Sequence, residues 1–130
     1  MRLIGTTREV KSSMNIGLCD GRHDVLTNDG DEMDYYLFRS PVLDPTATDL
    51  LEAVCRDFIQ KHITGDLSWK RSDDRRVNLF VTGLTPLLTS FLKSWVEQQE
   101  RLEMTCGDLV LWHWDTQTQQ YVPQRWAVIT

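Results

Sequence analysis

Hydrophobic side chains recur every three or four residues in two stretches of the chain, which is the spacing of one face of an α-helix. The first stretch follows Asp44 and Pro45, which suit an N-cap and a first helical position, and its helix is predicted to end near Gly65. The second begins at Thr85-Pro86. The two predicted apolar faces consist of Leu50, Leu51, Val54, Cys55, Phe58 and Ile59 and of Leu87, Leu88, Phe91, Leu92, Trp95 and Val96.

Shorter apolar and aromatic runs, bounded by turn residues, are typical of β-strands. They lie at residues 2–7, 34–39, 77–81 and 109–114, and two further runs at 121–122 and 126–129 are predicted to return as a hairpin or meander. Strands that alternate with helices favour a parallel sheet. We therefore expect one α/β domain over residues 1–130, a small Rossmann-like, mostly parallel sheet with flanking helices and an antiparallel C-terminal edge.

Residues 8–33 show no sustained hydrophobic period and are rich in Gly, Asp and Asn. These residue types favour turns. A loop of such length is uncommon in a compact domain and often has a function. The sequence therefore predicts that residues 8–33 form a long loop or a lid.

The composition restricts the classes of function. No apolar run approaches the roughly 20 residues needed to cross a bilayer, and the N-terminus lacks the pattern of a signal peptide, so a cytoplasmic protein with no membrane partner is expected. A net charge of −5 argues against binding of long nucleic acids, although a local pocket can still accept a small anion. The cysteines are widely spaced and are interpreted as free thiols: Cys19, Cys55 and Cys106.

The turn at residues 82–86 connects a predicted buried strand directly to a predicted helix. In open α/β sheets, ligands collect at the carboxyl ends of the strands, near helix N-termini with unpaired N–H groups. Gly83 would allow a ligand to approach closely, and the hydroxyls of Thr82 and Thr85 would suit a phosphate or a ribose. Alternatively, Thr85 only caps the helix and Gly83 only turns the chain. The residues themselves leave both interpretations open.

Residues 78–87, Asn-Leu-Phe-Val-Thr-Gly-Leu-Thr-Pro-Leu, resemble the strand-turn-helix motif of CRISPR-associated Rossmann-fold (CARF) domains, in which an Asn precedes a Thr-Gly-Gly-Thr-Lys-like turn. Residues 3–7 are placed like the first-strand loop of that family. The resemblance implies a CRISPR-associated or defence-linked homodimer that binds a small anionic nucleotide, a cyclic oligoadenylate, and that in some relatives cleaves it without a metal. The chain departs from the motif at Leu84, in place of a Gly, and at Pro86, in place of the Lys.

The resemblance also implies which residues would hold the ligand. Because the motif lacks its Lys, positive charge would have to come from Arg8, Arg22 or Arg39. Carried over residue by residue, ligand binding falls to Thr6, Thr7, Thr82, Gly83, Leu84 and Thr85.

Cleavage would require the ribose 2′-hydroxyl to attack the adjacent phosphate while donors stabilise the developing charge. The backbone N–H groups of Gly83 and Leu84 would be such donors, together with one arginine, for which Arg8 is the candidate. His23 or His113 would act as general acid or base, since imidazole titrates near neutral pH, and His23 is the main candidate. No metal or cofactor is predicted to take part.

Two other classes of function are consistent with the residues. The first is a non-enzymatic protein-interaction module that uses the aromatic C-terminal strands. Trp112 and Trp114 are predicted on one face of their strand and His113 on the other, a pattern typical of core or interface surface. The second is a metal-dependent phosphohydrolase that uses His23, Asp24 and the acidic residues after them. Because Asp and Asn favour turns, a solvated loop is the preferred interpretation of that segment.

Overall fold

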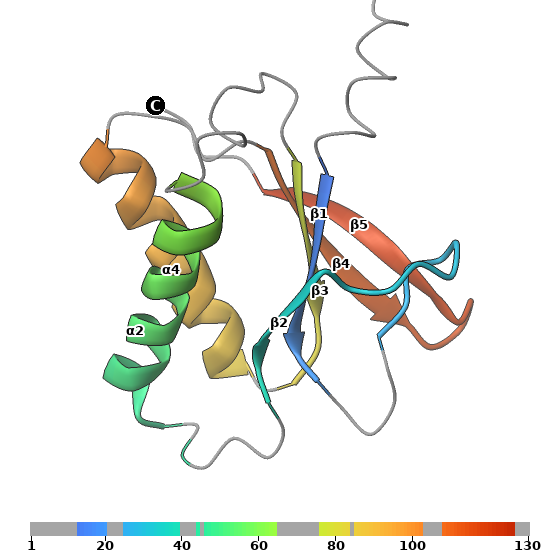
Figure 1. Cartoon of the computed structure of the whole chain (residues 1–130). Helices are drawn as coiled ribbons and strands as arrows, with labels where there is room; N and C mark the ends of the chain where they lie inside the picture. Colours follow the sequence, from blue (N-terminus) through green and yellow to red (C-terminus); the bar gives the residue numbers. More distant parts are fainter. Residues whose placement is uncertain are drawn as a thin grey trace, which may run out of the picture.

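The computed structural model describes residues 13–20, 25–39, 44, 46–64, 76–83, 85–102 and 108–126. Within these residues, a five-stranded sheet packs against two long helices (Figure 1). The strands are β1 (Ser13–Cys19), β2 (Tyr35–Phe38), β3 (Arg76–Val81), β4 (Asp108–Asp115) and β5 (Gln120–Trp126). The helices are α2 (Thr48–Ile59), which continues into the π-helical segment η1 (Gln60–Thr64), and α4 (Thr85–Leu102).

The strand order in the sheet is β2-β1-β3-β4-β5. β1 pairs in parallel with β2 and with β3, β3 pairs in parallel with β4, and β4 pairs with β5 in antiparallel. This confirms the predicted small α/β fold with a mostly parallel sheet and an antiparallel C-terminal edge. Of the helices in the described part of the chain, none combines the length and the apolar character needed to cross a membrane.

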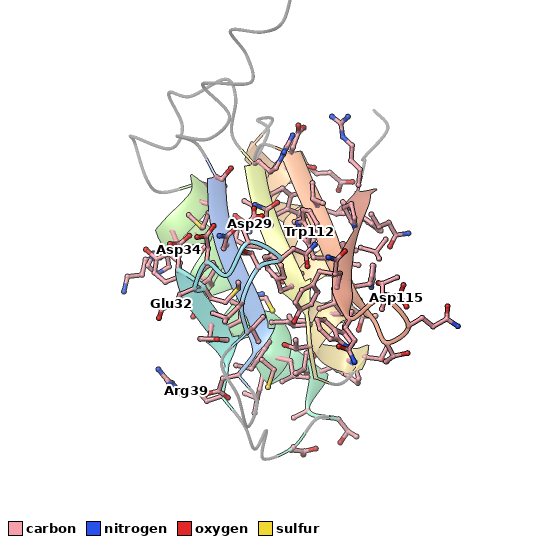
Figure 2. All side chains as sticks on the ribbon, turned by 90° about the vertical axis from the view of Figure 1, so that its right-hand side faces the viewer. Asp29, Glu32, Asp34, Arg39, Trp112 and Asp115 are labelled. Carbon is pink, nitrogen blue, oxygen red and sulfur yellow. The ribbon has the colours of Figure 1, made fainter. Side chains whose placement is uncertain are left out.

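The described part of the connection between β1 and β2 crosses the face of the sheet opposite the helices (Figure 1), and this face is turned to the viewer in Figure 2. We call residues 25–34 the strap and this side of the sheet the open face. The connections from β2 to β3 and from β3 to β4 run through the helix layer and in the opposite direction along the sheet. Parallel crossover connections are right-handed, so a connection that runs the opposite way along the sheet must cross the opposite face. The topology therefore places the strap on the open face.

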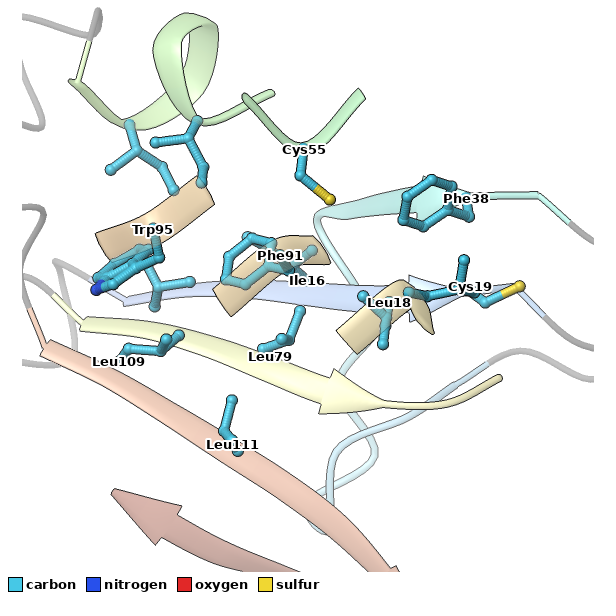
Figure 3. Packing of buried hydrophobic residues seen from close by; sticks show 14 of the residues in the cluster. Ile16, Leu18, Cys19, Phe38, Cys55, Leu79, Phe91, Trp95, Leu109 and Leu111 are labelled. Atoms are coloured by element: carbon cyan, nitrogen blue, oxygen red, sulfur yellow. The ribbon is translucent and has the colours of Figure 1, made fainter. Parts of the chain in front are cut away.

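The hydrophobic core lies between the helices and the other face of the sheet (Figure 3). Side chains alternate between faces along a strand, and one set from each central strand enters this core. Ile16, Leu79 and Leu111 are at most 3% exposed, and Phe91 and Trp95 of α4 cover them at 0% and 1%. Burial of such a side chain contributes about 1.5 to 3 kcal/mol. The helix-covered face is therefore the main apolar contribution to the stability of the fold.

β1 lies inside the segment that the sequence predicts as a continuous loop, so the prediction of a loop or lid over residues 8–33 was wrong at this strand. Met14, Ile16 and Leu18 alternate along it and are buried against the helices. The predicted first strand at residues 2–7 lies outside the described residues.

The other side of β1 explains why the sequence pattern hides this strand. Asn15 and Gly17 alternate with the buried residues, and both types are typical of turns. Gly17 is required here by close packing, because a Cβ at this position would lie 2.6 Å from the ring of Tyr36. Gly17, which suggests a turn in the sequence, is thus a strand residue that leaves space for the Tyr36 ring.

Helix α2 begins at Thr48, later than predicted, and its N-cap position, Ala47, makes no side-chain capping bond. The carboxylate of Asp44 instead accepts hydrogen bonds from the backbone N–H and the hydroxyl of Thr46, at 3.0 and 2.6 Å. The hydroxyl bond, followed by the backbone bond, lowers the pKa of Asp44. The prediction of Asp44 as the N-cap was wrong because its carboxylate organises the turn before the helix. Gly65, the predicted helix end, lies outside the described residues.

Strand β5 is continuous, whereas the sequence predicts two short runs at 121–122 and 126–129. Pro123 separates these runs in the sequence, and proline is unfavourable inside a sheet because it has no N–H to donate. β5 tolerates it because it is an edge strand that pairs with β4 alone. Residues 127–129 lie outside the described residues.

Candidate functional site

The carboxyl ends of β1 and β3 lie side by side at the point where the crossovers change direction. Ligands collect at such points in open α/β sheets. The hydroxyl of Thr82 joins the two ends: it accepts a hydrogen bond from the backbone N–H of Cys19 at 3.0 Å and donates one to the carbonyl of Cys19 at 2.6 Å. A hydroxyl has a single proton to donate. Thr82 therefore serves first to hold β1 and β3 together.

Gly83 follows in the left-handed backbone region, with φ of 88°. A Cβ at this position would lie 2.9 Å from the Cβ of Cys19 and 3.2 Å from Cδ1 of Leu87. Both the backbone conformation and the available space require glycine. Helix α4 begins at Thr85, so its first turn, with free N–H groups, starts beside this junction.

The thiol of Cys19 lies at the same junction and is 6% exposed. It donates a hydrogen bond to the carbonyl of Asp20 at 3.3 Å. Burial, and then the negative charge of Asp20, raise the pKa of Cys19 above its ordinary value. The thiol therefore stays protonated at neutral pH, which makes it a poor nucleophile.

A cleft of about 630 Å³ opens beside the junction, and we call it the carboxyl-end cleft. Its walls come from the ends of β1 and β3, from the strap and from the hairpin of β4 and β5. Among the described residues, the lining contains no Lys, Arg, Asp or Glu and consists of aromatic and other apolar side chains, amides and hydroxyls. The lining residues are Cys19, Val25, Leu26, Thr27, Asn28, Thr82, Trp114, Gln119, Gln120 and Tyr121.

Trp114 is the most accessible ring of this cleft, with 51% of its surface exposed. The ring of Tyr121 contacts it edge-to-face, with 5.1 Å between the ring centroids. Phe80 contacts Tyr121 in the same way, with 4.9 Å between their centroids. Phe80 also stacks on Trp112 at 5.8 Å. These ring contacts hold Tyr121 in place and leave Trp114 accessible. A flat, accessible aromatic ring is the group on which nucleic-acid bases stack.

A second cavity, of about 680 Å³, lies under the strap at the middle of the open face, and we call it the strap cavity. A row of hydrogen bonds crosses its floor from β4 to β1. The indole N–H of Trp112 donates to Oδ1 of Asn78 at 3.0 Å, and Nδ2 of Asn78 donates to Oδ1 of Asn15 at 3.0 Å. These polar groups are satisfied within the sheet, which explains how amides are tolerated beside buried strands.

The lining of the strap cavity includes four acidic residues: Asp31 and the three that Figure 2 labels, Asp29, Glu32 and Asp34. All four residues are exposed. Within the described ranges, no group of three or more His, Cys, Asp or Glu side chains is arranged to hold a metal ion. The predicted alternative of a metal site at His23 and Asp24 lies outside the described residues.

Of the residues that the sequence assigns to the ligand, the structure brings Thr82 and Gly83 to the carboxyl ends of the strands and places Thr85 in the first turn of α4. Thr82 lines the carboxyl-end cleft. The other predicted ligand-binding and catalytic residues lie outside the described residues: Thr6, Thr7, Arg8, His23 and Leu84.

Two further candidates lie away from the cleft. His113 is on the opposite side of β4 from its neighbours Trp112 and Trp114, as predicted, and its Nε2 is 2.8 Å from Oε1 of Gln124. Arg39 is 86% exposed, and its guanidinium lies 3.7 Å from the carboxylate of Asp20. Neither residue lines either cavity.

Sequence patterns missed the contribution of Asn28 and Tyr121. The side chain of Asn28 accepts a hydrogen bond from the backbone N–H of Tyr121 at 2.8 Å and donates one to its carbonyl at 3.0 Å. The local sequence marks Asn28 only as a turn residue before Asp29-Gly30. Nothing in a single sequence pairs two positions that are 93 residues apart.

Comparison of the chain with protein-family models, with curated proteins and with solved structures gave no match. The resemblance to CARF domains thus rests on the short segments 3–7 and 78–87. Only the second of these is described in part by the structure. The arguments for function below are therefore built from the geometry of the cleft.

Proposed function

We propose that the protein binds a small anionic nucleotide of the cyclic oligoadenylate class in the carboxyl-end cleft, as a cytoplasmic homodimer linked to CRISPR defence. The observation that carries the proposal is the position of the accessible Trp114 ring in a cleft at the carboxyl ends of parallel strands. Its volume, about 630 Å³, lies in the range of about 300 to 1,000 Å³ typical of small-molecule sites.

A base would stack on Trp114, while neutral polar groups around it would contact the base edge or the ribose. Such groups are the amides of Asn28, Gln119 and Gln120 and the hydroxyl of Thr27, all in the cleft lining. Stacking on one aromatic ring is worth about 1 to 3 kcal/mol per base. A phosphate would find its favourable field at the first turn of α4, beside Gly83.

The test is thermal melting of the purified protein with cyclic tetra- and hexa-adenylate, linear adenylates and mononucleotides. A ligand at about 100 times its dissociation constant stabilises the folded state by about 2.7 kcal/mol, which shifts the melting temperature measurably. We expect a shift with a cyclic adenylate. Analysis of products in the same mixture then separates binding from cleavage.

The matched variants are Trp114→Ala and Val122→Ala. Both side chains are exposed on the same hairpin, at 51% and 47%, but Val122 does not line the cleft. The shift should disappear in the first variant and persist in the second. Thr82 and Gly83 are unsuitable probes because their substitution also breaks contacts with Cys19. The proposal fails if no nucleotide shifts the wild-type protein, or if Trp114→Ala responds like wild type.

A second candidate function, the protein-interaction module, is favoured by the exposure of the hairpin. Five of the seven residues of β5 are exposed. The strand edge itself is protected by Asn28 and Pro123, so a partner would bind the side-chain surface around Val122. Val122→Asp should then abolish capture of that partner and leave nucleotide-induced melting shifts unchanged, which is the converse of Trp114→Ala.

A further inference from the structure

The tip of the strap holds its own shape. The backbone N–H of Thr27 bonds the carbonyl of Asp31 at 2.9 Å, and the N–H of Gly30 bonds the carbonyl of Thr27 at 2.9 Å. The hydroxyl of Thr27 accepts a further bond from the N–H of Asp31 at 3.0 Å. Leu26 and Glu32 pair as an antiparallel bridge on either side. The tip, residues 26–32, is thus a small hairpin with its own internal hydrogen bonds.

The two ends of the strap are fixed to the sheet. At one end, the N–H of Val25 donates to the hydroxyl of Tyr36 at 2.9 Å. At the other, Asp34 and Asn15 form two bonds, both 2.8 Å: the N–H of Asp34 to the carbonyl of Asn15, and the N–H of Asn15 to the Asp34 carboxylate. These anchors lie on β1 and β2, far along the sheet order from β5.

Between the strap and β5, the described residues form hydrogen bonds only through Asn28. Residues of an antiparallel pair alternate between those that bond the neighbouring strand and those that point away from it. Tyr121 and Pro123 belong to the outward set, since Tyr121 bonds Asn28 and Pro123 has no N–H. The Asn28 amide therefore occupies the free edge of β5, where it replaces the peptide group of a missing strand.

Thr27 and Asn28 line both the carboxyl-end cleft and the strap cavity. The tip of the strap is therefore the common wall of the two cavities. If the Asn28 bonds broke, the bonds that anchor the two ends of the strap would remain, and the wall between the cavities would open beside β5.

We propose that Asn28 is a latch that keeps the carboxyl-end cleft separate from the strap cavity. With the latch closed, the strap tip forms the wall between the two cavities, and the Trp114 ring is accessible only from the side of the carboxyl-end cleft. With the latch open, the two cavities join into one larger site, and Cys19, which lines the cleft, is reached from the open face as well. The gate is a property of the ligand-free protein, and only its effect on nucleotide binding rests on the proposed function.

Amide hydrogen exchange tests the closed state directly. In the wild-type protein, the Tyr121 N–H should exchange about tenfold or more slowly than that of Arg125, which also points outward. Asn28→Ala should remove this protection. Asn28→Asp keeps an acceptor for the N–H but loses the donor, so it should retain part of the protection. Asp29→Ala is the control, because Asp29 is the next strap residue and does not bond β5. Equal exchange of Tyr121 in wild type and Asn28→Ala would overturn the latch.

Alkylation of Cys19 tests access without any ligand. Iodoacetamide, read out peptide by peptide, should label Cys19 about tenfold faster in Asn28→Ala than in wild type or Asp29→Ala. Cys55, at 0% exposure under the helices, reports global unfolding and should stay unlabelled in all three proteins. Unchanged labelling of Cys19 in Asn28→Ala contradicts the gate, as does parallel labelling of Cys55.

Binding kinetics connect the latch with the proposed function. Where a ligand needs the joined cavities, which form only in a minor open state, removal of the closure raises the association rate by the inverse of the open fraction. Stopped-flow tryptophan fluorescence with cyclic adenylate should therefore show both association and dissociation accelerated in Asn28→Ala. Absence of nucleotide binding to either protein defeats the proposed ligand, whereas the latch is decided by exchange and alkylation. Binding with unchanged rates defeats the gate.

Discussion

The two faces of the sheet are built from the same strands and differ in almost every other respect. On the helix-covered face, Ile16 and Leu79 are completely buried among other apolar groups. One residue away, Asn15 and Asn78 face the other side and are joined by a side-chain hydrogen bond of 3.0 Å. The alternation of side chains thus divides a short sheet into an apolar face that stabilises the fold and a polar, aromatic face that the helices leave uncovered.

The covers of the two faces differ in the same way. Helices α2 and α4 bury large apolar side chains, whereas the strap is held by hydrogen bonds at its ends and at Asn28. A hydrogen bond contributes about 0.5 to 1.5 kcal/mol net, less than the burial of one large side chain. Of the two covers, the strap is therefore the one expected to open locally at the lower cost. Four experiments test this contrast between the two faces.

The largest effect is expected from truncation of an aromatic side chain on each face. Phe91→Ala leaves a cavity under the helices, where Phe91 is 0% exposed, and should lower the free energy of unfolding by about 3 to 5 kcal/mol. Trp114→Ala, at 51% exposure, should cost about 1 kcal/mol or less. Urea unfolding measures both. Similar losses for the two variants would refute the contrast between the faces.

Gly83 and Gly30 form a matched pair, since both have φ of 88°. Gly30→Ala introduces only backbone strain, about 1 to 2 kcal/mol, because nothing lies within 4 Å of the added Cβ. Gly83→Ala adds a clash with the Cβ of Cys19 at 2.9 Å and should cost about 2 to 4 kcal/mol. Equal losses in the free energy of unfolding, measured with urea, would show that the junction of β1 and β3 accommodates an added Cβ as easily as the strap does.

Alkaline pH should destabilise the helix-covered face through Cys55. Burial, and then the charge of Glu52, raise the pKa of Cys55 from 9.0 to about 12. Above about pH 9 the unfolded thiol loses its proton while the folded one keeps it, so stability falls as pH rises, by up to about 1.4 kcal/mol per pH unit. Unfolding at pH 8 and pH 10.5 should show a smaller loss in Cys55→Ala than in wild type. An identical pH dependence would contradict this burial.

The smallest effect concerns the hydrogen-bond row on the open face. Asn78→Ala leaves the indole N–H of Trp112 without its acceptor and should cost about 1 to 2 kcal/mol. Asn15→Ala removes only the other end of the row and should cost less. Both are measured by urea unfolding, with the near-ultraviolet signal of tryptophan as a local probe. A reversed order would place the important bond at Asn15.

Much of the fold could be predicted because its helices and most strands are long and regular. The apolar spacing of α2 and the compact run of β3 both reflect burial on one face, which sequence periodicity records directly. β1 was missed because Gly17 and Asn15 meet requirements of the open face: space for the Tyr36 ring and a partner for Asn78. Such requirements depend on neighbours that are distant in the sequence.

Only one part of the candidate site, the turn with Thr82 and Gly83, could be predicted from the sequence. The turn with Thr82 and Gly83 follows a general rule for α/β sheets, and it does lie at the carboxyl ends of the strands. The structure adds a role that the sequence did not predict, because the Thr82 hydroxyl bonds Cys19. Its contact with a ligand stays a prediction. The other half of the cleft, Asn28 and Tyr121, comes from pairing across the whole chain, which no local motif encodes.

These long separations also set the order in which the molecule is completed. The bonds between Cys19 and Thr82 span 63 residues, and those between Asn28 and Tyr121 span 93. Closing such long loops carries an entropic cost that local helical contacts avoid, so they form late in folding. The β4–β5 hairpin also follows every other described element during synthesis. A nascent chain would therefore contain folded helices well before the carboxyl-end cleft is complete, and refolding should regain helical signal before it regains protection of the Tyr121 amide.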